Sequence, residues 1–158
     1  MLHRAIDAFT DSHEATKNAK EVFRPFYRLY SGAVMDVLYD YFLATDVSEF
    51  TEESLFSFSQ EVYGTLDTYS TELPEYFARM FPSMKQHNWL FNYRTRPGIQ
   101  RSLGGLVKRA AYLTESDTAF QLFEKHYDFL NECYHILWAD IKPFARQQLD
   151  ILQHETEN

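Results

Sequence analysis

The chain has 158 residues, the size of one compact domain that is large enough to bury a core. Apolar residues make up 45% of it and charged residues 24%, a balance that excludes wholesale disorder. The formal net charge of -8 argues against a general affinity for nucleic acid or for an anionic membrane surface. Because the sequence contains no run of about 18 apolar residues, we expect no transmembrane span.

The residue composition favours helices over strands. Five glycines and five prolines are too few for a fold that is dense in turns, and aromatic residues make up 17% of the chain. We therefore predict an all-α fold, a single-domain bundle of about six to seven helices over residues 1–152. Residues 153–158 are polar, and we expect them to form a frayed tail.

Apolar positions three and four residues apart predict the helices in chain order. The first four predicted helices cover residues 2–10, 12–24, 33–44 and 51–69. Pro74 opens the next helix, and a short segment begins at Asn88. The last two helices cover residues 99–113 and a long stretch that begins at Ser116. Pro25 should interrupt the second segment, and Pro97-Gly98 should precede the helix over 99–113. Thr51 is the expected N-cap of its helix, because two glutamates follow it.

The C-terminal segment has the clearest pattern. Its apolar positions, separated by steps of three and four residues, are Phe120, Phe123, Tyr127, Leu130, Tyr134, Leu137, Ile141 and Phe144. Such a seam is typical of a helix packed lengthwise against its neighbours. We predict one long helix in the bundle core, kinked near Pro143, with a dimer seam as the alternative.

Two of the predicted helices place ionisable side chains one turn apart. His3, Asp7 and Asp11 follow one another in steps of four, and so do Asp36 and Asp40. Residues four apart share a helix face, so each segment can direct its side chains towards one point. An imidazole and several carboxylates inside a bundle suit a divalent metal such as manganese, magnesium or iron.

The pair on the second of these helices lies in an otherwise apolar run, residues 34–43. A carboxylate in such surroundings must be paired, coordinated or neutralised, so Asp36 and Asp40 strengthen the metal hypothesis.

Ordinary local roles are the alternative for the acidic residues near the N-terminus. Asp7 could pair with Arg4 or with Lys17, each a contribution of about 1 kcal/mol or less. Asp11 could cap the helix that begins at Ser12.

Cysteine usage bears on the cellular compartment. Cys133 is the single cysteine, which permits neither an internal disulfide nor a thiolate zinc cluster. Because a chain without disulfides suits a reducing environment, we expect a cytoplasmic protein.

Residues 3–13 read His-Arg-Ala-Ile-Asp-Ala-Phe-Thr-Asp-Ser-His. This run resembles the His-Arg-x-Ile-Asp-x-Phe-Thr-Asp-x-His motif of the acyl carrier protein phosphodiesterases. Residues 36–44, Asp-Val-Leu-Tyr-Asp-Tyr-Phe-Leu-Ala, are similar to the family's second signature, Asp-Val-x-x-Asp-His-Phe-Leu-Ala. Weaker matches follow downstream, at residues 73–74, 88–93, 98–99 and 103–109.

The resemblance implies a helical, metal-dependent phosphodiesterase, distantly like the HD-type phosphohydrolases. The family reaction hydrolyses the 4′-phosphopantetheine–serine linkage of holo-acyl carrier protein and gives the apo form, with manganese as the usual ion. The alternative is a non-catalytic helical module that is derived from the family and binds the carrier protein or associates with itself.

The resemblance also implies roles for individual residues. The implied metal ligands are His3, Asp7 and Asp40. Asp40 and Asp7 are also the implied catalytic groups, together with Arg4, which would face the substrate phosphate. The side chains implied to orient these groups are Asp11, Asp36, His13 and Tyr41.

Two features depart from the family pattern. Tyr41 stands where the family usually has histidine, and a phenol with a reference pKa of about 10 is a poor substitute for a neutral imidazole. The family also ordinarily carries a segment ahead of the first motif, including a further histidine and aspartate. We expect the absence of that segment to leave an apolar face uncovered, which would favour self-association or binding to a partner.

Charge is distributed unevenly along the chain. Residues 76–114 contain seven basic residues and no acidic one, whereas the other residues carry all 23 acidic side chains. Acyl carrier proteins are acidic along the helix after the modified serine, so we expect one to dock here in a salt-sensitive manner. The expected contact residues are Lys85, Arg94, Arg96, Arg101, Lys108 and Arg109. Neutralisation of acidic residues on other helices is the alternative role for these side chains.

Overall fold

The computed structural model describes residues 2–156, and this part of the chain is helical without strands. Its elements are α1 (Leu2–Ser12), α2 (Glu14–Tyr27), the 3-10 helix η1 (Arg28–Tyr30), α3 (Ser31–Thr45), α4 (Glu52–Thr68), α5 (Glu75–Gln86), α6 (Trp89–Asn92), α7 (Arg96–Arg109), α8 (Asp117–Lys125) and α9 (Tyr127–Thr156). The predicted all-α fold is confirmed. Within the described residues no helix is long and apolar enough to cross a membrane.

The chain forms two compact units, and it passes between them inside helices. The first unit comprises Met1–Val37 and Leu103–Asn158, and the second comprises Leu38–Ser102. One crossing falls within α3 and the other within α7, so neither lies in a flexible linker. The single domain expected over residues 1–152 stays a prediction.

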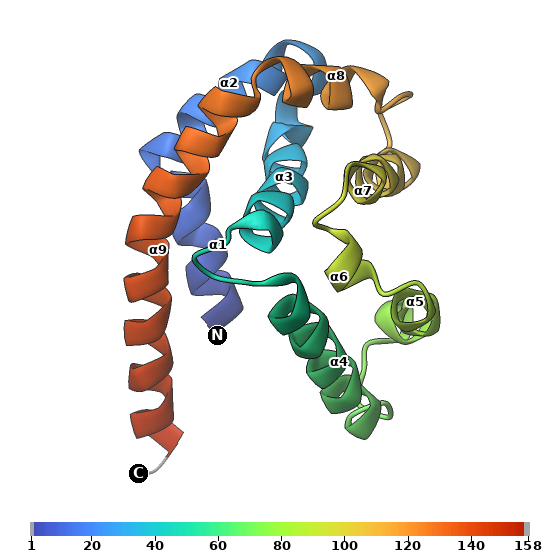
Figure 1. Ribbon diagram of the computed structural model, residues 1–158, viewed down its shortest axis with the longest axis vertical. Helices are drawn as coiled ribbons and strands as arrows, with labels where there is room; N and C mark the ends of the chain where they lie inside the picture. The colour runs from blue at the N-terminus through green and yellow to red at the C-terminus, as the bar shows by residue number, and fades with distance from the viewer. Residues whose placement is uncertain (1, 157–158) are drawn as a thin grey trace. The chain divides into compact units, whose positions relative to one another are not determined.

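In the first unit α9 packs along α1 and α2, as Figure 1 shows with the orange-to-red helix beside the two blue ones. Ala15 and Ala19 are buried one turn apart on α2, and such small side chains let a neighbouring helix approach closely. Phe9 of α1 and Phe144 of α9 stack with their ring centroids 4.4 Å apart. This packing fixes the helix that carries the first sequence motif.

A buried tyrosine ties α2 to the beginning of α8. The hydroxyl of Tyr27 accepts a hydrogen bond from the backbone N–H of Ala119 at 2.8 Å and donates to Glu115. Burial is the main reason that the pKa of Tyr27 is raised. Glu115 also accepts from the N–H of Thr118 at 2.9 Å, so it satisfies a donor at the helix start that Ser116 leaves open.

The second unit has a small aromatic core. Tyr63 of α4 packs with Phe81 and Met84 of α5, and the hydroxyl of Tyr63 accepts a hydrogen bond from the N–H of Leu90 at 3.0 Å. The partly buried side chains around this core are Leu66, Leu73, Phe77, Trp89 and Leu90. The hydroxyl bond therefore connects α4 with α6.

Both predicted helix starts in this unit are confirmed. The Oγ1 atom of Thr51 accepts from the N–H of Ser54 at 3.1 Å, and the Oγ atom of Ser54 accepts from the N–H of Thr51 at 2.9 Å. This reciprocal pair satisfies backbone donors that the first turn of α4 leaves without intrahelical partners. Pro74 stands at the N-cap of α5.

The predictions that relied on proline as a helix breaker were wrong. Helix α2 continues through Pro25 and ends at Tyr27. Helix α7 begins at Arg96 and so includes Pro97 and Gly98, because a proline in a first turn gives up no intrahelical hydrogen bond. It ends at Arg109, earlier than the predicted end at Leu113.

The long C-terminal helix is shorter than its apolar seam suggested. The chain leaves helical geometry at His126, where φ is -109° and ψ is 21°, so α8 and α9 are separate helices. Helix α9 continues through Pro143 to Thr156, and residues 153–156 of the predicted tail are therefore helical. Residues 157–158 lie outside the described part, and the kink at Pro143 stays a prediction.

Candidate functional site

The first motif lies on α1, and its four-residue spacing brings two side chains together as predicted. The Nδ1 atom of His3 lies 3.0 Å from the Oδ2 atom of Asp7. Both side chains are exposed, His3 to 84%. Arg4 is exposed on the same helix. The motif thus presents an imidazole–carboxylate pair to solvent.

Asp7 and Asp11 have other partners than the local ones considered from the sequence. The partner of Asp7 is His3, while Lys17 pairs with Glu14 at 3.6 Å. Asp11 does not cap the next helix but accepts a hydrogen bond from the Nζ atom of Lys20 at 3.2 Å. Asp11 therefore faces α2 and stays near the other acidic groups.

His13 caps α2 and holds it to α9. Its Nδ1 atom accepts from the N–H of Ala15 at 3.2 Å, which places the ring proton on Nε2. The Nε2 atom lies 3.0 Å from the Oδ2 atom of Asp140 and donates to it. Both ring nitrogens are engaged in structural contacts, so the implied orienting role of His13 gains no support. The sequence carried no signal for Asp140, which is 127 positions away.

Asp36 occupies the rim of a pocket in the first unit. The pocket is lined by Asp11, Lys20, Arg24, Arg28, Leu29, Ser31, Gly32, Ala33 and Asp36. Asp36 remains accessible to solvent, while Val34 and Met35 on α3 are buried. The apolar run around Asp36 therefore does not enclose its carboxylate, and the pairing or coordination expected for it stays a prediction.

The pKa of Asp36 reflects its surroundings. Partial desolvation by the surrounding protein is the main reason that the pKa of Asp36 is raised, and the negative charges of Asp11 and Asp7 raise it further. Lys20 opposes this shift. The negative charges on α1 therefore act on the carboxyl group of Asp36 on α3.

The second motif is divided between the two units, and Asp40 and Tyr41 belong to the second one. Asp40 is exposed on α3, one turn beyond Asp36. Tyr41 is only 3% exposed, its phenol oxygen accepts a hydrogen bond from the Nη1 atom of Arg96, and the guanidinium lies over its ring at 5.1 Å. Tyr41 is therefore a core residue with a cationic partner in its own unit.

The donor chemistry of His3, Asp7, Asp11 and Asp36 suits a divalent cation of hard or borderline character. Among residues 2–156, no three histidine, cysteine, aspartate or glutamate side chains are placed together so that they could hold a metal ion. Of the side chains expected to bind a metal, His3 and Asp7 are in contact with each other.

Two members of the predicted carrier-binding set are engaged with acidic residues of their own unit. Lys85 lies 2.8 Å from both carboxylate oxygens of Asp67. Arg94 binds Glu52 at 2.9 Å and stacks over the ring of Phe91 at 4.2 Å. The neutralising role considered from the sequence is therefore real for these two. Arg101, Lys108 and Arg109 are exposed.

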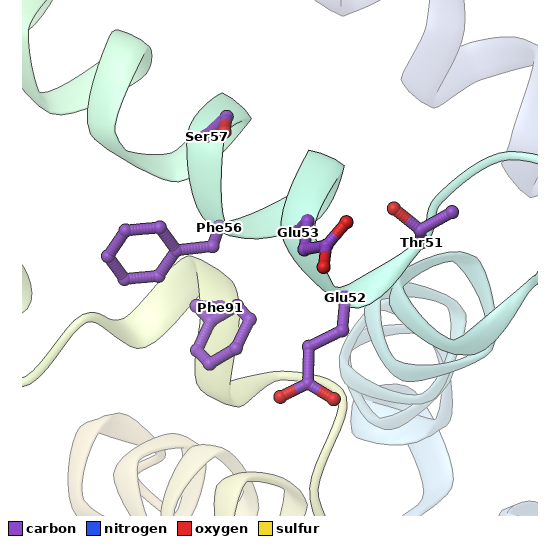
Figure 2. Close-up of a pocket in the computed structure, with 6 residues that line it drawn as sticks. All are labelled: Thr51, Glu52, Glu53, Phe56, Ser57 and Phe91. Atoms are coloured by element: carbon purple, nitrogen blue, oxygen red, sulfur yellow. The ribbon is translucent and has the colours of Figure 1, made fainter.

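A shallow pocket in the second unit lies beside Arg94 and was not anticipated. Figure 2 shows its lining residues, Thr51, Glu52, Glu53, Phe56, Ser57 and Phe91. The rings of Phe56 and Phe91 meet edge to face, with centroids 5.4 Å apart and an interplanar angle of 90°. Because Glu52 and Glu53 give the pocket an acidic rim, it does not suit a phosphate group.

Cys133 shows no sign of reactivity. The side chain is buried on α9, and burial raises the pKa of its thiol, with a further contribution from Glu132. A thiol in this environment is a poor nucleophile at neutral pH.

The basic residues at the Asp36 pocket were missed from the sequence. Lys20, Arg24 and Arg28 follow one another in steps of four, as the acidic residues of the first motif do. The same spacing rule that marked the acidic series would have found this basic one. The pocket therefore combines acidic and basic side chains.

Comparison with known proteins assigns the family. The sequence profile named acyl carrier protein phosphodiesterase matches residues 1–141. The chain belongs to this family. Among curated family members, the acyl carrier protein phosphodiesterase of Enterobacter sp. (strain 638) is 31% identical over 131 residues, which cover 82% of this chain and 68% of that protein.

Two further family members give similar values. The acyl carrier protein phosphodiesterase of Photorhabdus laumondii is 27% identical, covering 80% of this chain and 64% of that protein, and the one from Yersinia pestis is 28% identical, covering 85% and 70%. The chain thus spans about two thirds of the length of these relatives. No solved structure matches the chain at a significant level.

Proposed function

We propose that this chain is a metal-dependent phosphodiesterase that hydrolyses the 4′-phosphopantetheine–serine linkage of holo-acyl carrier protein and gives the apo form. Family membership and the printed names of the relatives support the reaction class and the protein substrate. The water that is consumed adds to phosphorus, the bond from phosphorus to the serine oxygen breaks, and that oxygen takes up a proton.

The observation that carries this proposal is the contact of 3.0 Å between His3 and Asp7 on the first motif, in the same unit as the carboxylates of Asp11 and Asp36, which line one pocket. Such carboxylates hold divalent cations, and the His3 imidazole beside Asp7 adds a nitrogen donor. We propose His3 and Asp7, which are in contact, as ligands of manganese, with magnesium or iron as alternatives. Asp11 and Asp36 are proposed to orient these ligands, since the described residues contain no preformed group of three ligating side chains. The ligand role of Asp40 rests on its motif position alone.

When bound, the metal would supply a Lewis acid and lower the pKa of a bound water molecule. The side chains of this chain have separate tasks. Asp7 holds the imidazole of His3 in place through the contact at 3.0 Å. Arg4, one residue from His3 on an exposed helix face, is proposed to contact the substrate phosphate.

The carrier protein is proposed to dock on the basic segment. Arg101, Lys108 and Arg109 are exposed, so they are available to an acidic partner. Lys85 and Arg94 would have to share their cationic groups between a carrier protein and their present partners, Asp67 and Glu52. Arg96 is also proposed to contact the carrier protein, although its guanidinium already binds Tyr41. A cytoplasmic location and self-association also stay predictions.

The test measures manganese binding and turnover on the same protein preparations. Purified chain is titrated with manganese by isothermal calorimetry, and release of apo-carrier protein is followed with and without the ion. Asp7→Asn and Asp36→Asn should each weaken manganese binding at least tenfold and abolish turnover. Asp150→Asn, a change on an exposed stretch of α9, is the matched control and should retain both properties.

Two results would contradict the proposal. Turnover that is unaffected by chelation of metal would exclude metal dependence. Binding of holo-carrier protein without any turnover at saturating manganese would favour the non-catalytic carrier-binding module.

A further inference from the structure

The pocket that contains Asp36 has a second, basic half. It is formed by the last turns of α2, the 3-10 helix η1 and the first turn of α3. Lys20, Arg24 and Arg28 contribute cationic side chains, and Leu29 adds an aliphatic side chain that is 99% exposed. All of these residues belong to the first unit.

The basic side chains are only partly neutralised by the chain itself. Lys20 contacts Asp11 at 3.2 Å, and Arg24 contacts Glu21 at 2.7 Å through an exposed ion pair on its own helix. An exposed pair of this kind is weak, so an anionic ligand competes with it easily. Arg24 can therefore turn its guanidinium to a ligand at little cost.

The backbone at Arg28 is held in a conformation that disfavours a side chain. Its φ is 47° and its ψ is -117°, values that a non-glycine residue rarely adopts. The N–H of Arg28 donates to the carbonyl of Arg24, and the carbonyl of Arg28 accepts from the backbone N–H and from the hydroxyl of Ser31. These hydrogen bonds hold the backbone of Arg28 in place at the rim of the pocket.

The charge arrangement indicates the chemistry of the ligand. The pocket holds the carboxylates of Asp11 and Asp36 and, beside them, two arginines and a lysine that suit an anion. A phosphate group needs positive groups for its oxygens, and arginine binds such oxygens with two parallel N–H groups. The exposed Leu29 offers an apolar surface to an organic substituent on the phosphate.

We propose that Lys20, Arg24 and Arg28 form the phosphate-binding half of this pocket and that Leu29 contacts the organic arm of the bound phosphate ester. The proposal rests on the proposed function for the identity of that ester, the 4′-phosphopantetheine diester of a carrier protein. The binding of a phosphate group as such does not depend on turnover. The ligand class is therefore a phosphate mono- or diester whose organic substituent has an aliphatic part.

The test separates recognition of phosphate from catalysis. Binding of inorganic phosphate and of free 4′-phosphopantetheine to the full chain is measured by isothermal calorimetry in low salt, without metal and with manganese. Arg24→Ala and Arg28→Ala should each weaken the binding of both probes about tenfold, the value of one lost charged hydrogen-bonding partner. Arg146→Ala, an exposed arginine on α9, removes one positive charge elsewhere in the unit and should leave binding unchanged.

Two further variants sharpen the assignment. Arg28→Lys keeps the charge but loses the two parallel N–H groups, so it should bind phosphate more weakly than the unmodified chain. Leu29→Ser should weaken the binding of 4′-phosphopantetheine while leaving inorganic phosphate unaffected. That difference distinguishes recognition of the ester from recognition of free phosphate.

The two proposals fail in different ways. Equal loss of phosphate binding in Arg24→Ala, Arg28→Ala and Arg146→Ala would reduce the effect to net charge and overturn the phosphate site. Unchanged KM and turnover in Arg24→Ala and Arg28→Ala, in a chain that hydrolyses holo-carrier protein, would overturn it as well. Site-specific phosphate binding without turnover would leave it standing and contradict the proposed function alone.

Discussion

Tyr41 and Arg96 bind each other across 55 positions of sequence, the phenol oxygen accepting from the guanidinium while the cation lies over the ring at 5.1 Å. Tyr41 stands where the motif of this family usually has histidine. Because the tyrosine is buried and has a partner, its phenol serves the packing of the second unit. The tyrosine that replaces the motif's histidine therefore makes a structural contact, its bond with Arg96.

Tyr41→Phe should destabilise the chain without affecting manganese binding. The ring and its contact with the guanidinium remain, whereas the charged hydrogen bond is lost, a change of about 1–3 kcal/mol. Urea unfolding followed by circular dichroism measures the free energy of unfolding, and calorimetry measures the metal. Loss of manganese binding in a folded Tyr41→Phe protein would show instead that the phenol takes part in the metal site.

Tyr27→Phe should cost about 1–3 kcal/mol in the free energy of unfolding. The hydroxyl is the acceptor for the buried N–H of Ala119, and its removal leaves that donor without its acceptor at the start of α8. Urea unfolding gives the magnitude. Tyr30→Phe, on the 3-10 helix, is the matched control and should change stability by less than about 0.5 kcal/mol. Equal effects in the two variants would contradict the role given to the Tyr27 hydroxyl.

Glu115 should make stability depend on pH in the acidic range. The backbone N–H of Thr118 is the main reason that the pKa of Glu115 is lowered in the folded chain. The unfolded chain therefore binds more protons between the two pKa values, and stability falls as the pH drops through that range.

The variant Glu115→Gln tests this dependence, because its amide oxygen can still accept from Thr118 but carries no charge. The unmodified chain should be the more stable at pH 7, and the difference should disappear below the folded pKa of Glu115. Urea unfolding at pH 7 and pH 3 measures both values. A stability difference that is equal at the two pH values would assign the effect to the hydrogen bond rather than to the charge.

Gly98→Ala should destabilise the second unit by about 3 kcal/mol or more. A Cβ atom at this position would overlap the carbonyl oxygen of Asn92 and lie 2.9 Å from its carbonyl carbon, both of them backbone atoms. Gly64→Ala is the control, since nothing lies within 4 Å of the added atom on α4, and it should stabilise by up to about 1 kcal/mol. Thermal unfolding compares the two. A neutral Gly98→Ala would mean that the turn before α7 adapts.

Local patterns in the sequence were sufficient to predict most of the helices. The N-cap at Thr51 and the start of α5 at Pro74 follow from hydrogen bonds within one turn, so a few neighbouring residues decide them. The break at His126 has no comparable local signal, because the apolar positions continue across it at helical spacing. The spacing of apolar residues indicates which side chains are buried, but it does not indicate where a helix ends.

In the candidate site, too, contacts within one helix could be predicted from the sequence and contacts between helices could not. Four-residue spacing correctly paired His3 with Asp7, since both lie on one helix. The same spacing left open whether Asp36 is buried, and its exposure was decided by how α3 is covered. Nothing local connects His13 with Asp140, which meet only because α9 returns along the first two helices.

The sequence by itself therefore determined the helical class, the family, and the residue types at the site, because composition, motifs and helical periodicity are properties of neighbouring residues. The tertiary structure alone decided which charges meet. It joined Tyr41 to Arg96 and Arg94 to Glu52, and it placed Lys20, Arg24 and Arg28 in one pocket with Asp11 and Asp36. Electrostatic interactions act over a few ångströms of space, whatever the separation in the chain, so only the folded arrangement specifies them.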